Sequence, residues 1–253
     1  MTVESGSAAD EAGEPSARWK EVWESRDLPT TGPSMLSRLL TADGFDTPFG
    51  SFYPSNWVEF VERRATDLQL GPGASVFDVG CGAGAFLHVV RRRGCKVAGV
   101  DWSPRLVKMA REAMPDGEFA VAEARALDVK PQVDVVVSCC VFPYFPSIDY
   151  AADVVERMVA KATRAVAILD LPDEAMKHAA LEYRRAMSGG ASEYAANYEG
   201  LEHCYYDRGW VVKALRDNGL TGIEIKDQDL ADYGNGRFRF NAWGFKPASR
   251  SRY

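Results

Sequence analysis

Histidine and cysteine are scarce in this chain. Only three histidines and five cysteines occur among 253 residues, and no Cys/His pair has metal-ligand spacing, so no metal site is expected. The cysteine count is odd, and Cys139 and Cys140 are adjacent. This pattern argues against a disulfide framework and favours free thiols in a reducing compartment, which predicts a cytoplasmic protein.

Long apolar runs and an excess of positive charge are also missing. No run approaches the length of a membrane span. Residues 1–16 are acidic and rich in Ser, Gly and Ala, which predicts a disordered tail rather than a secretion signal. Lysine and arginine total 30 against 36 acidic residues, a net charge of −6. Because nucleic-acid enzymes usually carry a basic footprint, nucleic acid is not expected as a partner. A membrane is not expected either, because no apolar run is long enough to span it.

The most informative feature that is present is a strand that ends in three spaced glycines. Residues 76–79 are apolar with β propensity, except for Asp78. Gly80, Gly82 and Gly84 then alternate through a tight turn, and an apolar helix-like segment follows. Glycines at such a turn bring backbone N–H groups close to a ligand.

Asp78 indicates which ligand this loop suits. The dinucleotide fingerprint has the spacing G-x-G-x-x-G, whereas here the spacing is G-x-G-x-G with a carboxylate two residues earlier. That carboxylate would repel a pyrophosphate and attract an amino group, which argues against an NAD-dependent oxidoreductase. S-adenosylmethionine carries an ammonium and a sulfonium and no phosphate. The stretch resembles motif I of the class I S-adenosylmethionine-dependent methyltransferases, with Asp78 at the acidic position.

A second acidic residue follows the next predicted strand. Asp101 stands at the end of the apolar segment 96–100, 21 positions after Gly80. A carboxylate at that place in a βαβ nucleotide site can accept both ribose hydroxyls. The resemblance implies that the next residue, Trp102, packs on the adenine; a tryptophan that only covers the following helix is the alternative.

Two further segments extend the resemblance, which covers roughly residues 70–246. Residues 118–127 are similar to the family's third strand and the acidic-Ala pair after it, which assigns Glu123 and Ala124 to the adenine amino group, with Glu where Asp is usual. Residues 133–144 resemble the fourth strand, whose end lies against the methionine part of the cofactor and the acceptor. The resemblance therefore implies cofactor contact for Ser138 and acceptor contact for Phe142 and Tyr144.

The resemblance also implies the architecture. We expect a Rossmann-like α/β core at 71–247, with seven mostly parallel strands, an antiparallel last strand and helices on both faces. Residues 17–70 would form an N-terminal helical lid and pocket segment, and residues 248–253 a tail. The segment 173–206 exceeds the dozen or so residues that an ordinary crossover needs. We interpret it as a helical cap above the strand ends, or else as a helix pair of a homodimer; monomer and homodimer both stay open.

Several side chains outside the motifs are candidates for the pocket. Trp19 and Trp23 share a helix face, either as a core stripe or as a lid in which Trp23 contacts the cofactor. The alternating segment 237–245 reads as the last strand, and an antiparallel direction would place three residues before or at its start near the substrate: Tyr233, Asn235 and Arg237. An arginine there would grip a carboxylate or phosphate, or else pair with an acid of the cap.

Methyl transfer from a sulfonium is an in-line displacement that depends mainly on positioning the acceptor about 3 Å from the methyl carbon. A general base is needed only when the acceptor loses a proton of high pKa. His203 is the candidate base, against a purely structural role, and Tyr144 and Tyr206 would orient the acceptor. Asp170, at the end of the fifth strand, would reach the acceptor or cap the first helix of the insertion.

The Asn/Asp-Pro-Pro-aromatic box of enzymes that methylate adenine and glutamine is absent from 133–144. The expected function is thus S-adenosylmethionine-dependent O- or N-methylation of a small polar metabolite or natural-product intermediate, with S-adenosylhomocysteine as the product. A C-methyltransferase and a non-catalytic S-adenosylmethionine-binding protein are the alternatives.

Overall fold

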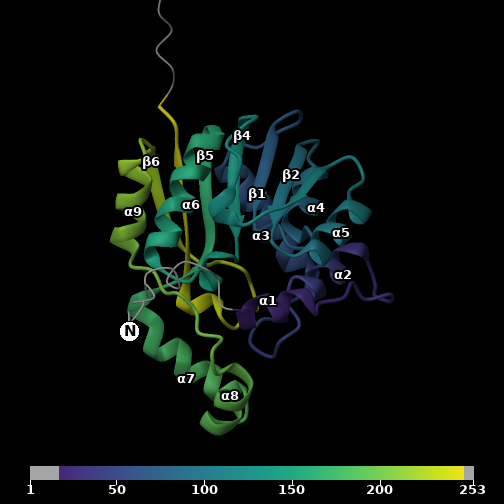
Figure 1. Ribbon diagram of the computed structural model, residues 1–253, viewed down its shortest axis with the longest axis vertical. Helices are drawn as coiled ribbons and strands as arrows, with labels where there is room; N and C mark the ends of the chain where they lie inside the picture. Colours follow the sequence, from purple (N-terminus) through teal and green to yellow (C-terminus); the bar gives the residue numbers. More distant parts are fainter. Residues whose placement is uncertain (1–16, 248–253) are drawn as a thin grey trace, which may run out of the picture.

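The computed structural model describes residues 17–247, which build a central sheet covered by helices on both faces (Figure 1). The tails expected at 1–16 and 248–253 lie outside these residues. The sheet has the strand order β3-β2-β1-β4-β5-β7-β6. The strands are β1 (Ser75–Val79), β2 (Lys96–Asp101), β3 (Glu118–Val121), β4 (Val133–Cys139), β5 (Ala162–Pro172), β6 (Thr221–Asp227) and β7 (Arg239–Phe245). The first five are parallel and β7 is antiparallel to β5 and β6, which confirms the predicted fold class.

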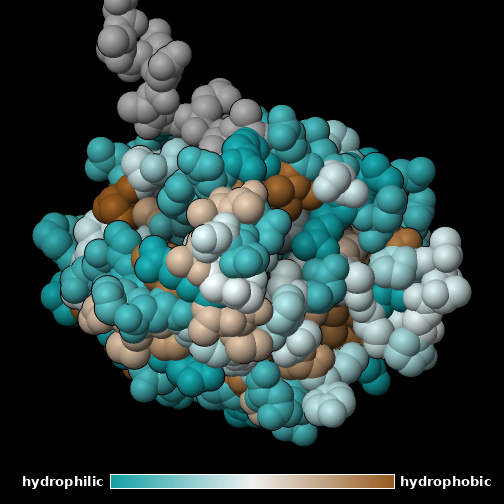
Figure 2. Space-filling view, turned by 90° about the horizontal axis from the view of Figure 1, so that it is seen from below, coloured by the Kyte–Doolittle hydropathy of each residue, from teal (hydrophilic) through white to brown (hydrophobic). Residues whose placement is uncertain are grey.

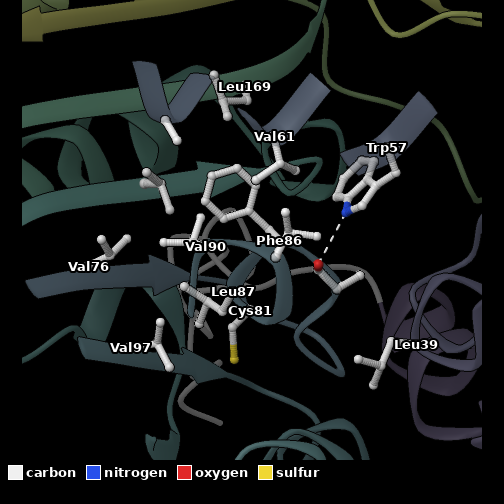
Figure 3. Packing of buried hydrophobic residues seen from close by; sticks show 14 of the residues in the cluster. Leu39, Trp57, Val61, Val76, Cys81, Phe86, Leu87, Val90, Val97 and Leu169 are labelled. Atoms are coloured by element: carbon white, nitrogen blue, oxygen red, sulfur yellow. Dashed lines mark hydrogen bonds between the residues drawn. The ribbon is translucent and has the colours of Figure 1, made fainter. Parts of the chain in front are cut away.

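Two apolar cores flank the sheet because its strands are buried on both faces. On β4, Val135 and Val137 face one core and Val136 faces the other. The first core is covered by α2 (Met35–Ala42), α3 (Pro54–Asp67), α4 (Ala85–Arg91) and α5 (Pro104–Ala113), the second by α6 (Ile148–Lys161) and α9 (Arg208–Asp217). Figure 3 shows Trp57 of α3 reaching the start of α4, where its Nε1 donates to the Ala85 carbonyl at 3.1 Å.

The strand order places a ligand crevice at β1. The chain runs outward from β1 through β2 to β3, then returns to the other side of β1 as β4. At such a switch point the loops after neighbouring strands diverge, and ligands bind outside the carboxyl ends of the strands. Three helices lie at that end of the sheet: α1 (Ala17–Glu24), α7 (Lys177–Met187) and α8 (Ala191–Tyr198) (Figure 1). From this side the surface is mainly hydrophilic, with small apolar areas between polar ones (Figure 2).

Helix α6 begins at Ile148, because the Ser147 side chain accepts a hydrogen bond from the Tyr150 N–H and caps it. One predicted boundary, the start of the last strand, was wrong. The last strand begins at Arg239 rather than at residue 237, because Gly236–Phe238 forms a 3-10 helix. Within residues 17–247 no helix is both long and apolar enough to cross a membrane.

Candidate active site

A pocket opens at the carboxyl ends of β1, β2 and β4, and four carboxylates line it: Asp43, Asp78, Asp101 and Glu123. No lysine or arginine of the described chain lines the pocket. Glu123, at the outer edge, pairs with Lys20 of α1 at 3.0 Å. No group of His, Cys, Asp or Glu in residues 17–247 is arranged to hold a metal ion. The pocket is therefore an acidic site that suits an organic cation.

Carboxylates already occupy the backbone N–H groups of the glycine loop. Gly82 N donates to Asp101 Oδ2 at 2.9 Å. Ala83 N and Ala85 N donate to the two carboxylate oxygens of Asp43 at 2.6 and 3.0 Å. The expectation that these amides face a ligand was wrong, and a phosphate would find its usual donors taken by charges of its own sign.

Asp43 is a site residue that the sequence did not reveal. It is the C-cap residue of α2, 40 positions before the amide of Ala83 that it binds. No local pattern distinguishes it from other carboxylates, because its role depends on how α2 packs against α4. Gly82 adjoins it closely, since a Cβ on that glycine would stand 2.4 Å from Asp43 Oδ1.

Burial gives these carboxylates unusual proton affinities. Burial raises the pKa of Asp43 to about 7 and that of Asp101 to about 6. The pKa of Asp78 is raised well above its ordinary value, by burial first and by the charges of Asp43 and Asp101 second. Asp78 Oδ1 is buried without a hydrogen-bond partner. A buried acceptor without a hydrogen-bond donor destabilises the fold, so Asp78 suits a ligand that supplies a cationic donor.

Other predicted cofactor residues divide into two groups. Gly80, Trp23, Trp102 and Ala124 line the pocket together with the carboxylates. Gly84 and Ser138 are not among the lining residues. Gly84 allows α4 to pack against α5, since a Cβ there would lie 2.4 Å from Met114. Ser138 is fully buried and its hydroxyl donates to the Val79 carbonyl at 2.8 Å, which ties β4 to β1.

Tyr144, in the 3-10 helix Phe142–Tyr144 that follows β4, lines one wall of the pocket. Its ring lies between two tryptophans of α1, with ring centroids 4.6 Å from Trp19 and 5.1 Å from Trp23. His203 meets the same ring edge-on at 5.5 Å. Burial raises the pKa of Tyr144 to about 12, so its hydroxyl stays protonated and can donate a hydrogen bond but not remove a proton.

His203 lies behind Tyr144 and does not line the pocket. Arg184 Nη1 donates to His203 Nδ1 at 2.8 Å, and arginine can only donate. Burial and the charges of Arg184 and Arg239 lower the pKa of His203 well below its ordinary value. A neutral imidazole has one lone pair, and here Arg184 occupies it. The geometry therefore does not support His203 as the general base.

Three other predicted side chains are not brought to the pocket. Tyr206 is fully buried, and its hydroxyl donates to the carbonyl of Phe142 at 2.8 Å, away from the lining residues. Phe142 itself packs in the second core. Arg237 is exposed, because the 3-10 helix turns it outward over the ring of Tyr183, 4.6 Å from the ring centroid.

Tyr233 belongs to a buried polar network at the end of β5. Its hydroxyl donates to Asp170 Oδ2 at 3.1 Å, Gln228 donates to Oδ1 at 2.7 Å, and Arg239 forms an ion pair with the same carboxylate. Asn235 is buried beside this network, with its N–H bonded to the Phe49 carbonyl at 3.1 Å. Neither residue lines the pocket.

One of the two expectations for Asp170 was that it caps the first helix of the insertion, and this expectation was wrong. The Asp173 side chain takes that role and accepts from Ala175 N at 3.0 Å. The carboxylate of Asp170 is instead fully engaged in the polar network of Tyr233, Gln228 and Arg239.

Residues 77–186 match the family model described as a methyltransferase domain. This match, the curated relatives and the structural neighbours support the class I S-adenosylmethionine-dependent methyltransferase family. Over 78 residues it is 36% identical to a ubiquinone biosynthesis O-methyltransferase of Xanthomonas campestris pv. campestris, a match that covers 31% of this chain and 30% of that one. Over 99 residues it is 33% identical to a trans-aconitate 2-methyltransferase of Azoarcus sp., covering 36% and 39%. The chain thus spans well under half the length of these relatives.

Solved structures of the family share the fold. Magnesium protoporphyrin IX methyltransferase of Synechocystis PCC 6803, with bound S-adenosylhomocysteine, matches at a TM-score of 0.59 and 17% identity over 82% of this chain and 96% of that one. The N-methyltransferase NodS of Bradyrhizobium japonicum matches at 0.59 and 16%, over 91% and 97%. At these identities the likeness establishes the architecture alone.

Proposed function

We propose that this protein binds S-adenosylmethionine in the acidic pocket and transfers its methyl group to a small polar acceptor, on O or N. The observation that carries the proposal is the set of three buried carboxylates, Asp43, Asp78 and Asp101, which form no ion pair within the described residues, and of which Asp78 has a buried oxygen without a donor. Asp78 would accept the ammonium, Asp101 the ribose hydroxyls, and Glu123 the adenine amino group, with Trp102 on the adenine face.

Both oxygens of Asp101 are held by backbone donors, Gly82 N and Ser103 N, each at 2.9 Å. A carboxylate oxygen has a further lone pair, so these bonds orient Asp101 without exhausting it. The same bonds fix the loop before the cofactor arrives. Such preorganisation reduces the ordering that binding requires.

The bound cofactor supplies an electrophilic methyl group with a good leaving group. The task of the chain is then to orient the acceptor and exclude water. The Tyr144 hydroxyl would orient the acceptor as a hydrogen-bond donor. The two tryptophans of α1 cover the ring of Tyr144 and would close the pocket from solvent.

The relatives' names support a small-molecule acceptor without choosing one. They include methyltransferases of ubiquinone biosynthesis and of trans-aconitate, and the structural neighbours include an N-methyltransferase. O- and N-methylation thus both occur among proteins similar to this one.

Calorimetric titration with S-adenosylhomocysteine and with NAD tests the cofactor. We expect S-adenosylhomocysteine to bind and NAD not to bind; NAD binding without S-adenosylhomocysteine binding would overturn the proposal. Asp101→Ala should weaken S-adenosylhomocysteine by about tenfold or more, as loss of hydrogen bonds to a charged group costs about 1.5–3 kcal/mol. The matched control Asp116→Ala removes an exposed carboxylate and should leave the affinity unchanged.

A further inference from the structure

Arg184 is a buried cation without a carboxylate partner. It lies on α7 in the insertion after β5 and is 3% exposed. No acidic group of residues 17–247 forms a salt bridge with it, and its Nε has no hydrogen-bond partner. A buried charge is costly unless it is paired, and an unsatisfied buried donor requires an explanation.

The other buried arginines of the described chain are paired. Arg64 binds Asp67 at 2.9 Å, and Arg239 binds Asp170. The fold thus supplies counter-ions where a buried arginine serves structure alone. Arg184 differs from both, since its contacts are aromatic rings, the neutral imidazole of His203 and the hydroxyl of Tyr205, and no carboxylate.

The surroundings of Arg184 hold the guanidinium in place without neutralising it. The rings of Phe49, Tyr194 and Tyr198 lie with their centroids 5.0, 5.5 and 5.4 Å from its Cζ. Cation–π contacts of this kind orient a guanidinium and leave its positive charge available. The bond from Nη1 to His203 Nδ1 at 2.8 Å adds a fixed direction. The arrangement is that of a preorganised anion receptor.

Arg184 does not itself line the pocket, and it is linked to Tyr144 of the pocket wall through His203. His203, its hydrogen-bond partner, contacts the ring of Tyr144, which lines the pocket. The positive charges of Arg239 and Arg184 both lower the pKa of Tyr144 against the effect of burial. Since Asp170 neutralises Arg239, Arg184 supplies the uncompensated positive charge beyond Tyr144.

We propose that the methyl acceptor carries an anionic group, a carboxylate or a phosphate, and that Arg184 binds it. This inference rests on the proposed methyltransferase function and names the chemical class of its acceptor. The site would then hold two ligands of opposite charge, a cation against the carboxylates and an anion against Arg184. A neutral acceptor of the same shape would leave the buried guanidinium unpaired, and the site would discriminate against it.

The test is a calorimetric titration of the full chain, saturated with S-adenosylhomocysteine, with three probes of similar shape: benzoate, phenyl phosphate and benzamide. We expect at least one anion to bind about tenfold or more tightly than benzamide, because hydrogen bonds to a charged group are stronger than those between neutral groups. The better of the two anions distinguishes a carboxylate acceptor from a phosphate acceptor. Equal binding of all three probes, or binding of none, would overturn the inference.

Two variants locate the effect. Arg184→Met should abolish the preference for the anion, and Arg184→Lys should retain part of it. Arg185→Gln is the matched control, because it removes an exposed charge from the next position of the same helix and should change nothing. A loss of preference in Arg185→Gln equal to that in Arg184→Met would overturn the inference.

The affinity for S-adenosylhomocysteine, measured on every variant, separates the two proposals. Cofactor binding without anion preference in the wild type rejects the anionic acceptor alone, whereas absence of cofactor binding rejects the methyltransferase function. If Arg184→Met fails to fold, retention of the preference in Arg184→Lys supports the inference and its absence there rejects it.

Discussion

Asp43 lies directly against Gly82, so that a Cβ on the glycine would stand 2.4 Å from the carboxylate oxygen Oδ1. The same oxygen accepts a hydrogen bond from the next amide of the loop, Ala83 N. Helix α2 and the glycine loop are therefore joined at a point where only glycine fits. The middle glycine of the motif is required here by a carboxylate of the protein itself.

Gly82→Ala should displace Asp43 and loosen the loop. Its φ of +55° adds backbone strain to the collision, so we expect a loss of about 2–4 kcal/mol in unfolding free energy together with much weaker S-adenosylhomocysteine binding. Gly73→Ala is the control, because φ is +85° there but nothing lies within 4 Å of the added Cβ. Urea denaturation and calorimetry measure both effects. Equal losses in the two variants would show that the contact with Asp43 is unimportant.

Asp43 should make the stability of the ligand-free protein depend on pH. A carboxyl whose pKa is raised on folding stabilises the folded state fully below pH 3.8, and this contribution is lost as the pH rises through about 7. In Asp43→Asn this loss is absent. The melting temperature of Asp43→Asn relative to the wild type should therefore increase between pH 5 and pH 8.

The exposed residue Glu59 provides the control for this titration. Glu59→Gln should keep a constant difference from the wild type over the same range, as measured by differential scanning fluorimetry. A constant difference for Asp43→Asn as well would mean that its carboxyl titrates alike in the folded and unfolded chain.

The ion pair between Asp170 and Arg239 at the end of β5 should contribute strongly to the free energy of unfolding. Asp170→Asn tolerates the local φ of +65°, since asparagine adopts the left-handed region, but leaves Arg239 buried and unpaired. We expect a loss of about 3–5 kcal/mol in urea denaturation. The double variant Asp170→Asn with Arg239→Met should recover much of it, and additive losses in the double variant would contradict a direct pairing.

His203 should remain neutral with its proton on Nε2, because Arg184 donates to Nδ1. Nitrogen-15 spectra of the histidine-labelled protein distinguish the tautomers and follow the charge from pH 8 to pH 5. The variant His203→Gln assigns the signal. Protonation of His203 above pH 6, or a proton on Nδ1, would restore it as a candidate base.

The positions of Asp78 and Asp101 in the pocket were predictable from their spacing along the chain. Asp78 and Asp101 lie at the ends of adjacent parallel strands, and such ends meet at one edge of a sheet. Their place therefore follows from positions along a short piece of chain. The seven mostly parallel strands and the antiparallel last strand followed from the resemblance and are confirmed.

The surroundings of Arg237 and His203 were not predictable in this way. The sequence placed Arg237 near the substrate by strand alternation, but a 3-10 helix turns it to solvent and leaves Arg239 buried with Asp170. It suggested His203 as a base because a neutral imidazole can accept a proton, without any information about the partner of its lone pair. That partner, Arg184, lies on α7, whereas His203 lies in the loop between α8 and α9.

The sequence by itself determined that Asp78 and Asp101 lie at one edge of the sheet beside the glycine turn, because a strand, a glycine turn and a helix are contiguous and their geometry follows from spacing. Only the tertiary structure decided which charges complete the site. Asp43 and Arg184 act through contacts between α2 and α4, and between α7 and the segment of His203. Such contacts depend on how packed helices bring distant side chains together, and residue spacing carries no record of that.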